Sequence, residues 1–324
     1  MRCSGSRPSS REVKSTDVRT RVLKEVGKVV VGREEETELL LVSLLARGHT
    51  LIEGVPGVSK TMLAKAFSKC LGLAFKRVQF TPDMLPLDIV GGFIFNMKSR
   101  EFEFRRGPVF TDILLADEIN RAPPKVQSAL LEAMQELQVT IEGYTEKLPS
   151  PFMVIATENP LEFQGVYPLP EGQLDRFMVK LKLDYPSASV ESAIIRRNLS
   201  EMDLEVVKQV VSSDELAAMF KGVEDVRVSD EILEYLAKIA SETRTDQRID
   251  LGASPRAMIH LVHEARSVAY LSGREYVIPD DIKKLSIYVL THRIKLDQSS
   301  ALRDQRLDVD TVIREVMDRV RPPR

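Results

Sequence analysis

The chain has 324 residues, of which 43% are apolar and 29% charged, so it is long enough for two domains and too apolar for wholesale disorder. Its formal net charge of −2 provides no overall positive field, so we do not expect nucleic acid as a partner. With two cysteines and no run of the roughly 18 apolar residues that a membrane span needs, we expect a cytoplasmic protein without a membrane span.

The first ten residues are polar and basic, and they lack the apolar segment of a secretory signal. We expect residues 1–15 to form a disordered tail. From residue 16 to residue 185, strand and helix patterns alternate, which predicts an α/β core. From residue 186 to residue 324 the pattern predicts a smaller domain made of helices alone.

Short apolar runs in the core alternate with stretches of helical periodicity. The runs that predict strands are Thr50–Ile52, Phe75–Phe80, Ile113–Ala116, Phe152–Ala156 and Met178–Leu183. The apolar positions that share one face of two intervening helices are Met62, Leu63, Ala66, Phe67 and Cys70, and Val126, Ala129, Leu130, Ala133, Met134 and Leu137. Continuous apolar strands separated by helices predict a parallel sheet covered on both faces, with ligands bound at the carboxyl ends of its strands.

A glycine-rich segment follows the first predicted strand and precedes a helix. Its eight residues are Gly54, Val55, Pro56, Gly57, Val58, Ser59, Lys60 and Thr61. In this position backbone N–H groups can surround a polyphosphate, the lysine can reach the outer phosphates and the threonine hydroxyl can bind Mg²⁺. Ser59 stands where glycine usually precedes the lysine, and this small side chain costs little if its φ is negative.

Two β-hairpins are predicted inside the core. Residues 91–110 carry aromatic residues on both sides of a polar tip at Asn96–Arg100, and residues 139–152 turn near Gly143. A hairpin inserted in an α/β domain serves either internal packing or contact with another molecule, and the sequence favours neither.

Two later strands end in side chains suited to ATP hydrolysis. Asp117 can hold Mg²⁺ opposite Thr61, and Glu118 can polarise the water that attacks the γ-phosphorus. Asn159 could orient that water, although a buried asparagine that caps the turn before Pro160 is the ordinary alternative.

Capping serines, a first-turn proline and a terminal glycine predict helices in the second domain, at residues 230–243, 255–272, 279–293 and 310–320. His260 and His263 lie one turn apart on one of these helices. No further cluster of His or Cys accompanies them in the sequence, so we expect no metal site there.

Taken in order, these motifs resemble those of the AAA+ ATPases and, within that superfamily, of the MoxR group. The stretches that carry the resemblance are residues 54–61, 117–125, 156–160 and 167–177. The resemblance runs from about Val31 to the C-terminus. It implies an AAA+ P-loop core, whose central parallel sheet is flanked by helices, followed by a smaller all-α lid domain, with ATP and Mg²⁺ as cofactors.

The resemblance implies roles for residues of the core. Val31 and Gly32 match the segment that packs against adenine. Lys60 matches the Walker A lysine and Thr61 its Mg²⁺ ligand. Asp117 and Glu118 match the Walker B pair, and Asn159 matches sensor 1.

The resemblance also implies roles for two arginines. Arg176 matches the arginine finger that reaches into the neighbouring subunit's site, a contact that makes hydrolysis depend on assembly. Arg256 matches sensor 2 on the lid, where contact with the γ-phosphate would tie the lid angle to the nucleotide state. ATP is then expected between core and lid, at a subunit interface.

The resemblance further implies a homo-oligomeric ring, a hexamer, that uses ATP hydrolysis for chaperone-like remodelling or maturation of client proteins, including insertion of a metal or cofactor. MoxR-like proteins often act with a partner that carries a von Willebrand factor A domain. The two hairpins fall where members carry inserts that face a pore or a client. Two alternatives stay open: a nucleotide-gated assembly module with weak turnover, and a DNA-acting AAA+ motor.

Overall fold

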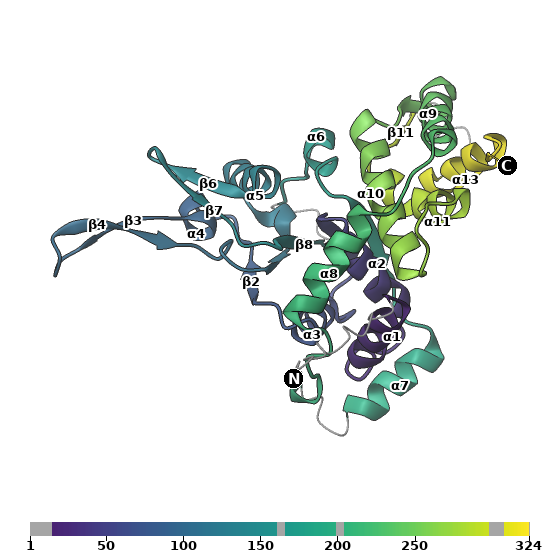
Figure 1. Cartoon of the computed structure of the whole chain (residues 1–324). Helices are drawn as coiled ribbons and strands as arrows, with labels where there is room; N and C mark the ends of the chain where they lie inside the picture. The colour runs from purple at the N-terminus through teal and green to yellow at the C-terminus, as the bar shows by residue number, and fades with distance from the viewer. Residues whose placement is uncertain (1–14, 161–165, 199–203, 298–307, 324) are drawn as a thin grey trace, which may run out of the picture.

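A five-stranded parallel sheet forms the centre of the fold in the computed structural model, which describes residues 15–160, 166–198, 204–297 and 308–323 (Figure 1). Its strands, in the spatial order β2-β5-β8-β1-β9, are β1 (Thr50–Gly54), β2 (Phe75–Gln79), β5 (Ile113–Asp117), β8 (Met153–Glu158) and β9 (Val179–Leu183). Each strand coincides with one of the predicted apolar runs. The predicted α/β fold with a central parallel sheet is therefore confirmed.

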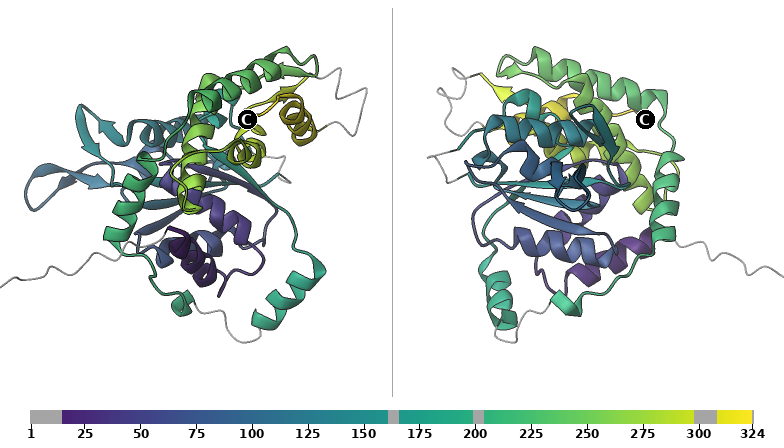
Figure 2. Two further views of the ribbon diagram at one scale, coloured as in Figure 1. Left: turned by 45° about the vertical axis from the view of Figure 1, so that its right-hand side comes forward. Right: turned by 90° about the vertical axis from the view of Figure 1, so that its left-hand side faces the viewer.

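The two faces of the sheet pack against different helices. Successive strand residues point to opposite faces, so Ile113 and Leu115 belong to one buried cluster while Leu114 and Ala116 belong to another. The first cluster includes α2 (Glu34–Leu45) and α3 (Lys60–Cys70), and the second includes α4 (Pro86–Val90), the 3₁₀ turn Ile119–Arg121 and α5 (Pro124–Glu136). The sheet is thus covered on both sides, as the continuous apolar strands predict (Figure 2).

A helix absent from the predictions begins the described chain. Helix α1 (Ser15–Val26) buries Val18, Val22 and Val26 in the cluster that contains α2 and α3. Their spacing of four residues places them on one helical face, a signal that was present in the sequence. Ser15, the last residue of the predicted tail, lies in this helix, and residues 1–14 of that tail lie outside the described residues.

Both predicted hairpins are present, and they contact each other. They consist of β3 (Gly91–Asn96) with β4 (Glu101–Arg106), and of β6 (Gln138–Ile141) with β7 (Tyr144–Lys147). The ring of Tyr144 lies 5.8 Å from that of Phe93 and 5.2 Å from that of Phe104, and Arg106 pairs with Glu146. The aromatic side chains of β3–β4 and the tip of the β6–β7 hairpin therefore form one aromatic unit beside the sheet.

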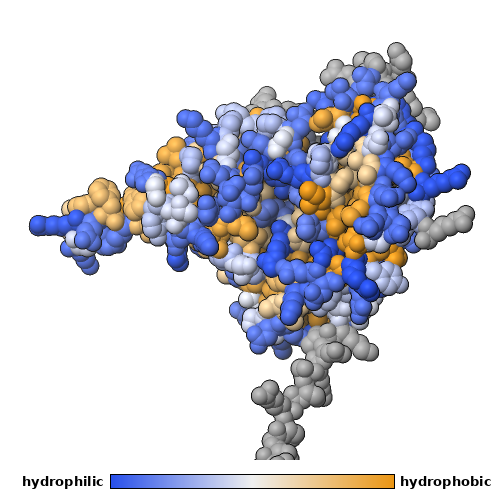
Figure 3. Space-filling view, turned by 45° about the horizontal axis from the view of Figure 1, so that its top comes forward, coloured by the Kyte–Doolittle hydropathy of each residue, from blue (hydrophilic) through white to orange (hydrophobic). Residues whose placement is uncertain are grey.

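The outer half of the β3–β4 hairpin carries exposed apolar side chains beside its polar ones. Ile94 and Phe95 are about half exposed, and Met97 and Phe102 are 85% and 70% exposed. Figure 3 shows this apolar surface along the protrusion that the hairpin forms. Because a folded monomer rarely leaves several large apolar side chains together in water, this surface is a candidate for contact with another molecule.

The C-terminal part of the chain is mostly helical. Its helices are α7 (Ala188–Asn198), α8 (Ser213–Glu224), α9 (Asp230–Thr245), α10 (Pro255–Leu271), α11 (Pro279–Leu290) and α13 (Val309–Arg319), with a 3₁₀ turn at Leu204–Val206. A buried cluster continues from α1–α3 into this region, and the Ser43 hydroxyl of α2 donates a hydrogen bond to Glu264 of α10 at 2.8 Å. None of the helices in the described residues is long and apolar enough to cross a membrane.

The predicted helical second domain is confirmed, and it also contains one short antiparallel pair, β10 (Ile249–Leu251) with β11 (Lys295–Leu296), which is too short to give a periodic signal. Two local predictions are wrong. The helix expected to reach residue 293 ends at Leu290, before that pair. Leu137 is 49% exposed rather than buried, since it ends α5 in a left-handed conformation that turns its side chain off the apolar face.

Candidate active site

The glycine-rich segment joins β1 to α3, as its position in the sequence predicts. A Cβ on Gly54 would lie 2.9 Å from the carbonyl oxygen of Leu183, so only glycine allows this close approach to β9. Gly57 has φ +86°, which glycine adopts without strain. Lys60 Nζ donates to the carbonyl oxygen of Gly54 at 2.7 Å, so the lysine folds over the loop that leads to it. The N–H groups of the first turn of α3, which a helix leaves without partners along its own backbone, give this loop the character of an anion site.

The backbone conformation of Ser59 is not the one in which its side chain would cost little. Its φ is +65°, and it stands at the N-cap of α3 without a side-chain capping bond. The chain must turn sharply from the loop into the helix at this residue, in a conformation that costs a residue with a Cβ about 1–2 kcal/mol. The condition of a negative φ is therefore not met, and the loop carries local backbone strain.

The two acids at the end of β5 are held by neighbouring side chains. Asp117 is buried and accepts hydrogen bonds from Thr157 Oγ1 at 2.6 Å and from Arg77 Nη2 at 2.7 Å. Glu118, with φ +57°, accepts from Gln79 Nε2 at 2.6 Å. Arg121 Nη1 donates to the same oxygen, Glu118 Oε2, at 3.1 Å, and the carboxylate retains further lone pairs that can accept a proton from water.

Arg77 and Gln79 are functional candidates that sequence reasoning missed. Both lie on β2, which pairs in parallel with β5 so that Gln79 is opposite Asp117. Only this pairing brings β2 side chains to the acids, and the strand order is not encoded in any single motif. The polar residues that alternate with buried Val78 were the available signal.

The structure gathers one set of predicted site residues at the carboxyl ends of β5, β8 and β1, which are adjacent strands. The members of this set are Lys60, Thr61, Asp117, Glu118 and Asn159. Asn159 is buried directly after β8. Thr61 and Asp117 offer the hard oxygen atoms that Mg²⁺ prefers, so the donors at this edge fit that ion.

The predicted adenine segment lies near the same edge. Gly32 has φ +72°, and a Cβ on it would lie 2.7 Å from a methyl carbon of Val190 in α7. The neighbouring Arg33 donates through Nη2 to the carbonyl oxygen of Asp184, just after β9, at 2.6 Å. Val31 and Gly32 therefore stand beside the carboxyl end of β9, next to the strand that leads into the phosphate loop.

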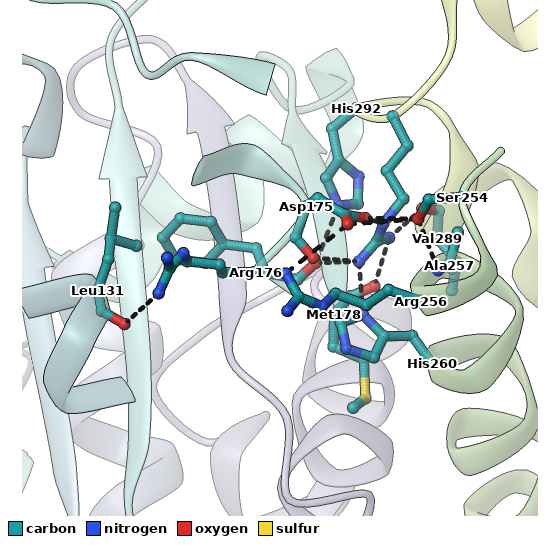
Figure 4. Close-up of polar contacts among 12 residues, drawn as sticks. Leu131, Asp175, Arg176, Met178, Ser254, Arg256, Ala257, His260, Val289 and His292 are labelled. Carbon is teal, nitrogen blue, oxygen red and sulfur yellow. Dashed lines mark hydrogen bonds and ion pairs between the residues drawn. The ribbon is translucent and has the colours of Figure 1, made fainter. Parts of the chain in front are cut away.

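The two predicted arginines lie at the opposite edge of the sheet. Arg176 precedes β9, and Arg256 lies in the first turn of α10, where its Nη1 is 3.8 Å from Asp175 Oδ2 (Figure 4). Both line a cavity of about 200 Å³ together with Gly48 and His49, which precede β1. From His49 to Gly54 the strand extends roughly 16 Å.

This placement of Arg256 differs from the expectation that the lid contacts ATP bound by its own core. Helix α10 packs against α2 through the Ser43–Glu264 hydrogen bond, and its first turn lies beside Asp175, which precedes β9. Its N-terminus consequently points to the amino ends of the strands. Within one chain, Arg256 and Arg176 are together, and both are distant from Lys60.

The cavity around the arginines is strongly cationic. Arg47 joins Arg176 and Arg256 in its lining, and in the described part of the chain no carboxylate belongs to that lining. Burial lowers the pKa of His49 to about 4 and that of His260 to about 3. Both histidines are therefore neutral at neutral pH, and the positive charge of the cavity comes from the arginines.

Comparison with known proteins identifies the family. The model of the ATPase family associated with various cellular activities (AAA) matches residues 49–179, and that of the AAA lid domain matches residues 241–316. Chaperone MoxR1 of Mycobacterium tuberculosis is 42% identical, over 98% of this chain and 86% of its own length. The chain belongs to the MoxR family of AAA ATPases.

Other relatives agree with this membership. YeaC of Bacillus subtilis is 44% identical, over 94% of each chain, and Protein MoxR of Methylorubrum extorquens is 28% identical, over 95% of this chain and 96% of its own. The crystal structure of a protein from Cytophaga hutchinsonii superposes with a TM-score of 0.87 at 40% identity, covering 96% of this chain and 97% of that one. This MoxR-family protein is accordingly an ATPase that binds and hydrolyses ATP, and the predicted family is confirmed.

The strain at Ser59 can be measured by substitution in this MoxR-family ATPase. We expect Ser59→Gly to raise the free energy of unfolding by up to about 1 kcal/mol, because glycine adopts the positive φ without steric cost but loses more chain entropy on folding. The matched variant Ser59→Ala keeps the Cβ and should stay within about 0.5 kcal/mol of the wild type. Urea and thermal unfolding compare the three proteins. Equal stabilisation by alanine and glycine would show that the positive φ is not the source of the cost.

Proposed function

We propose that the protein is a Mg²⁺-dependent ATPase whose active site is completed between neighbouring copies in a ring of six. The observation that carries this proposal is the separation of two sets of residues within one chain. The phosphate loop and the acids follow the carboxyl ends of the strands, whereas Arg176 and Arg256 lie at the amino ends.

The carboxyl edge supplies binding and activation of water. Lys60 and the N–H groups at the start of α3 bind the outer phosphates. Thr61 and Asp117 would hold Mg²⁺, which when bound neutralises charge on the phosphate oxygens. Glu118 accepts a proton from the attacking water, and Asn159 orients that water.

The amino edge supplies positive charge to a neighbour. If subunits stack edge to edge, the cationic cavity that contains Arg176 and Arg256 faces the phosphate loop of the next copy. Arginine supplied in this way can contribute roughly 10³–10⁵ in rate. The isolated subunit lacks this charge at its own phosphate loop, so hydrolysis depends on assembly.

Complementation between defective subunits tests the shared site. Arg176→Ala is expected to bind ATP normally, because its own phosphate loop is unchanged, and to lose turnover by about 10³-fold or more. Lys60→Ala is expected to lose turnover because it cannot hold the phosphates. In an equimolar mixture, about one quarter of the sites join an intact loop to an intact neighbouring arginine. We therefore expect phosphate release to recover in the mixture.

Two controls accompany this mixture. In the first control, energy transfer between labelled subunits establishes that mixed rings form. The second control is Arg274→Ala, which removes a lid arginine that pairs with Asp281 and does not line the cavity. Arg274→Ala should keep normal turnover. An inactive mixture in which subunit exchange has been demonstrated would overturn the shared site.

We further propose that ATP hydrolysis drives chaperone-like remodelling or maturation of client proteins, including insertion of a metal or cofactor, with a partner that carries a von Willebrand factor A domain. One relative is named Chaperone MoxR1. The exposed side chains of Phe95, Met97 and Phe102 on the β3–β4 hairpin support a surface for apolar segments of clients.

The hairpin surface can be tested with an unfolded protein as probe. Changing Phe95 and Phe102 together to serine should reduce, by half or more, the protection of reduced α-lactalbumin from aggregation in the presence of ATP. Their rings lie 5.3 Å apart on the exposed hairpin, so the loss removes apolar contact area and no buried core. Lys98→Ser at the tip is the matched control. Unchanged protection by a double variant with a normal melting temperature would contradict the proposed client surface.

A further inference from the structure

We propose that Arg293 is a positioning residue that fastens the turn bearing Arg176 to the lid, so that Arg176 and Arg256 are presented to the neighbouring subunit as one rigid unit. This inference rests on the proposed in-trans site and extends it. Arg293 follows α11 and touches neither ATP nor the phosphate loop of its own chain.

The guanidinium of Arg293 forms hydrogen bonds with residues 175–178, the turn that bears Arg176. Its side chain is 2% exposed. Nε donates to Asp175 Oδ1 at 2.7 Å, Nη2 donates to the carbonyl oxygens of Asp175 and Phe177, and Nη1 donates to that of Met178 at 3.1 Å. Four acceptors within the four residues 175–178 therefore meet one side chain from the lid. His292 adds a further bond, between Nε2 and the carbonyl oxygen of Phe177 at 3.0 Å.

The same guanidinium is also tied to the lid helices. Nη1 donates to the carbonyl oxygen of Val289 in α11, and Nη2 lies 2.6 Å from His260 Nδ1 in α10. Because arginine can only donate, His260 Nδ1 must be the acceptor, which keeps the proton of the imidazole on Nε2. Burial lowers the pKa of His260 to about 3, so the ring stays neutral and can accept this bond at neutral pH.

Asp175 links the two arginines that face the neighbour. It precedes Arg176 in the chain, and its carboxylate binds Arg293, accepts from the Ser254 hydroxyl at 3.3 Å and lies 3.8 Å from Arg256 Nη1. Ser254 in turn caps α10 by accepting from the N–H of Ala257 at 3.1 Å. Figure 4 shows these bonds gathered around Asp175, between the turn and the start of α10.

Burial of the charged Arg293 side chain costs free energy, so we expect an arginine here only if it holds the geometry of the turn that bears Arg176. Burial lowers the pKa of Arg293 to about 10, but the group remains protonated at neutral pH, so its charge must be matched by Asp175. The pair between Arg274 and Asp281 is a useful contrast, since it joins residues seven positions apart within the lid. Arg293 instead joins segments 118 residues apart at the boundary between sheet and lid.

Loss of the Arg293 contacts should affect the turnover rate and the binding of ATP differently. Loosening the turn should misplace Arg176 and Arg256 relative to the neighbour's γ-phosphate, while the phosphate loop of the same chain stays intact. A misplacement of about 1 Å can lower a rate by about 10²-fold. Arg293 should therefore influence kcat and leave the KM for ATP nearly unchanged.

Arg293→Lys tests this proposal, because lysine keeps the charge but cannot reach Asp175, the turn carbonyls and His260 together. We expect kcat to fall about 10²-fold, with the KM for ATP within about twofold of the wild type. Mixed with Lys60→Ala, the variant should regain turnover, since its intact phosphate loop receives arginines from the Lys60→Ala neighbour. Mixed with Arg176→Ala, it should regain none, because both subunits fail as arginine donors.

Three comparisons make the outcome decisive. Arg274→Lys, the matched lid variant, should keep a normal kcat. If Arg293→Lys does not fold, Asp175→Asn, which preserves shape and removes the charge that Arg293 binds, carries the same complementation test. If Arg176→Ala is rescued by Lys60→Ala but the Arg293 or Asp175 variant is not, or if Arg293→Lys has normal kcat, the positioning role is wrong. If Arg176→Ala itself is not rescued, the shared site fails instead.

Discussion

The parallel direction of the five strands is the constraint on which the rest of the structure depends. Because all five carboxyl ends lie at one edge, the phosphate loop, the two acids and Asn159 are brought together although they are far apart in sequence. The same constraint places Arg176, which precedes β9, at the other edge. One chain therefore contains both sets of residues of the proposed shared site but holds them roughly a strand length apart.

Backbone strain and hydrogen bonds from the neighbouring strand β2 characterise the carboxyl edge of the sheet. Ser59 and Glu118 both have positive φ. Ser59 lies in the phosphate loop, and Glu118 is the residue proposed to accept a proton from the attacking water. Non-glycine residues keep such conformations only where the surrounding structure imposes them, which is common at functional sites. Arg77 and Gln79 hold the acids from β2. At the amino edge, by contrast, Arg293 and Asp175 provide an interlocked support for the arginines.

The sequence predicts features that depend on local pattern and misses those that depend on pairing. Continuous apolar runs identify all five strands, and turn chemistry identifies both hairpins. The contacts of Arg77 and Gln79 require knowledge that β2 lies beside β5. The position of Arg256 depends on the packing of α10 on α2, which includes the buried Ser43–Glu264 bond and is indicated by no motif. The φ of Ser59 depends on how the loop enters the helix, which residue type alone does not determine.

A structure of the Glu118→Gln protein with ATP and Mg²⁺, determined by electron cryomicroscopy, tests the central claim most directly. Removal of the base should slow hydrolysis enough to trap the nucleotide in the assembled state. The account predicts a closed ring in which Arg176 and Arg256 of one subunit lie about 3 Å from γ-phosphate oxygens bound by Lys60 of the next. Contact between Arg256 and the ATP held by its own chain, or full occupancy of ATP in monomers, would contradict it.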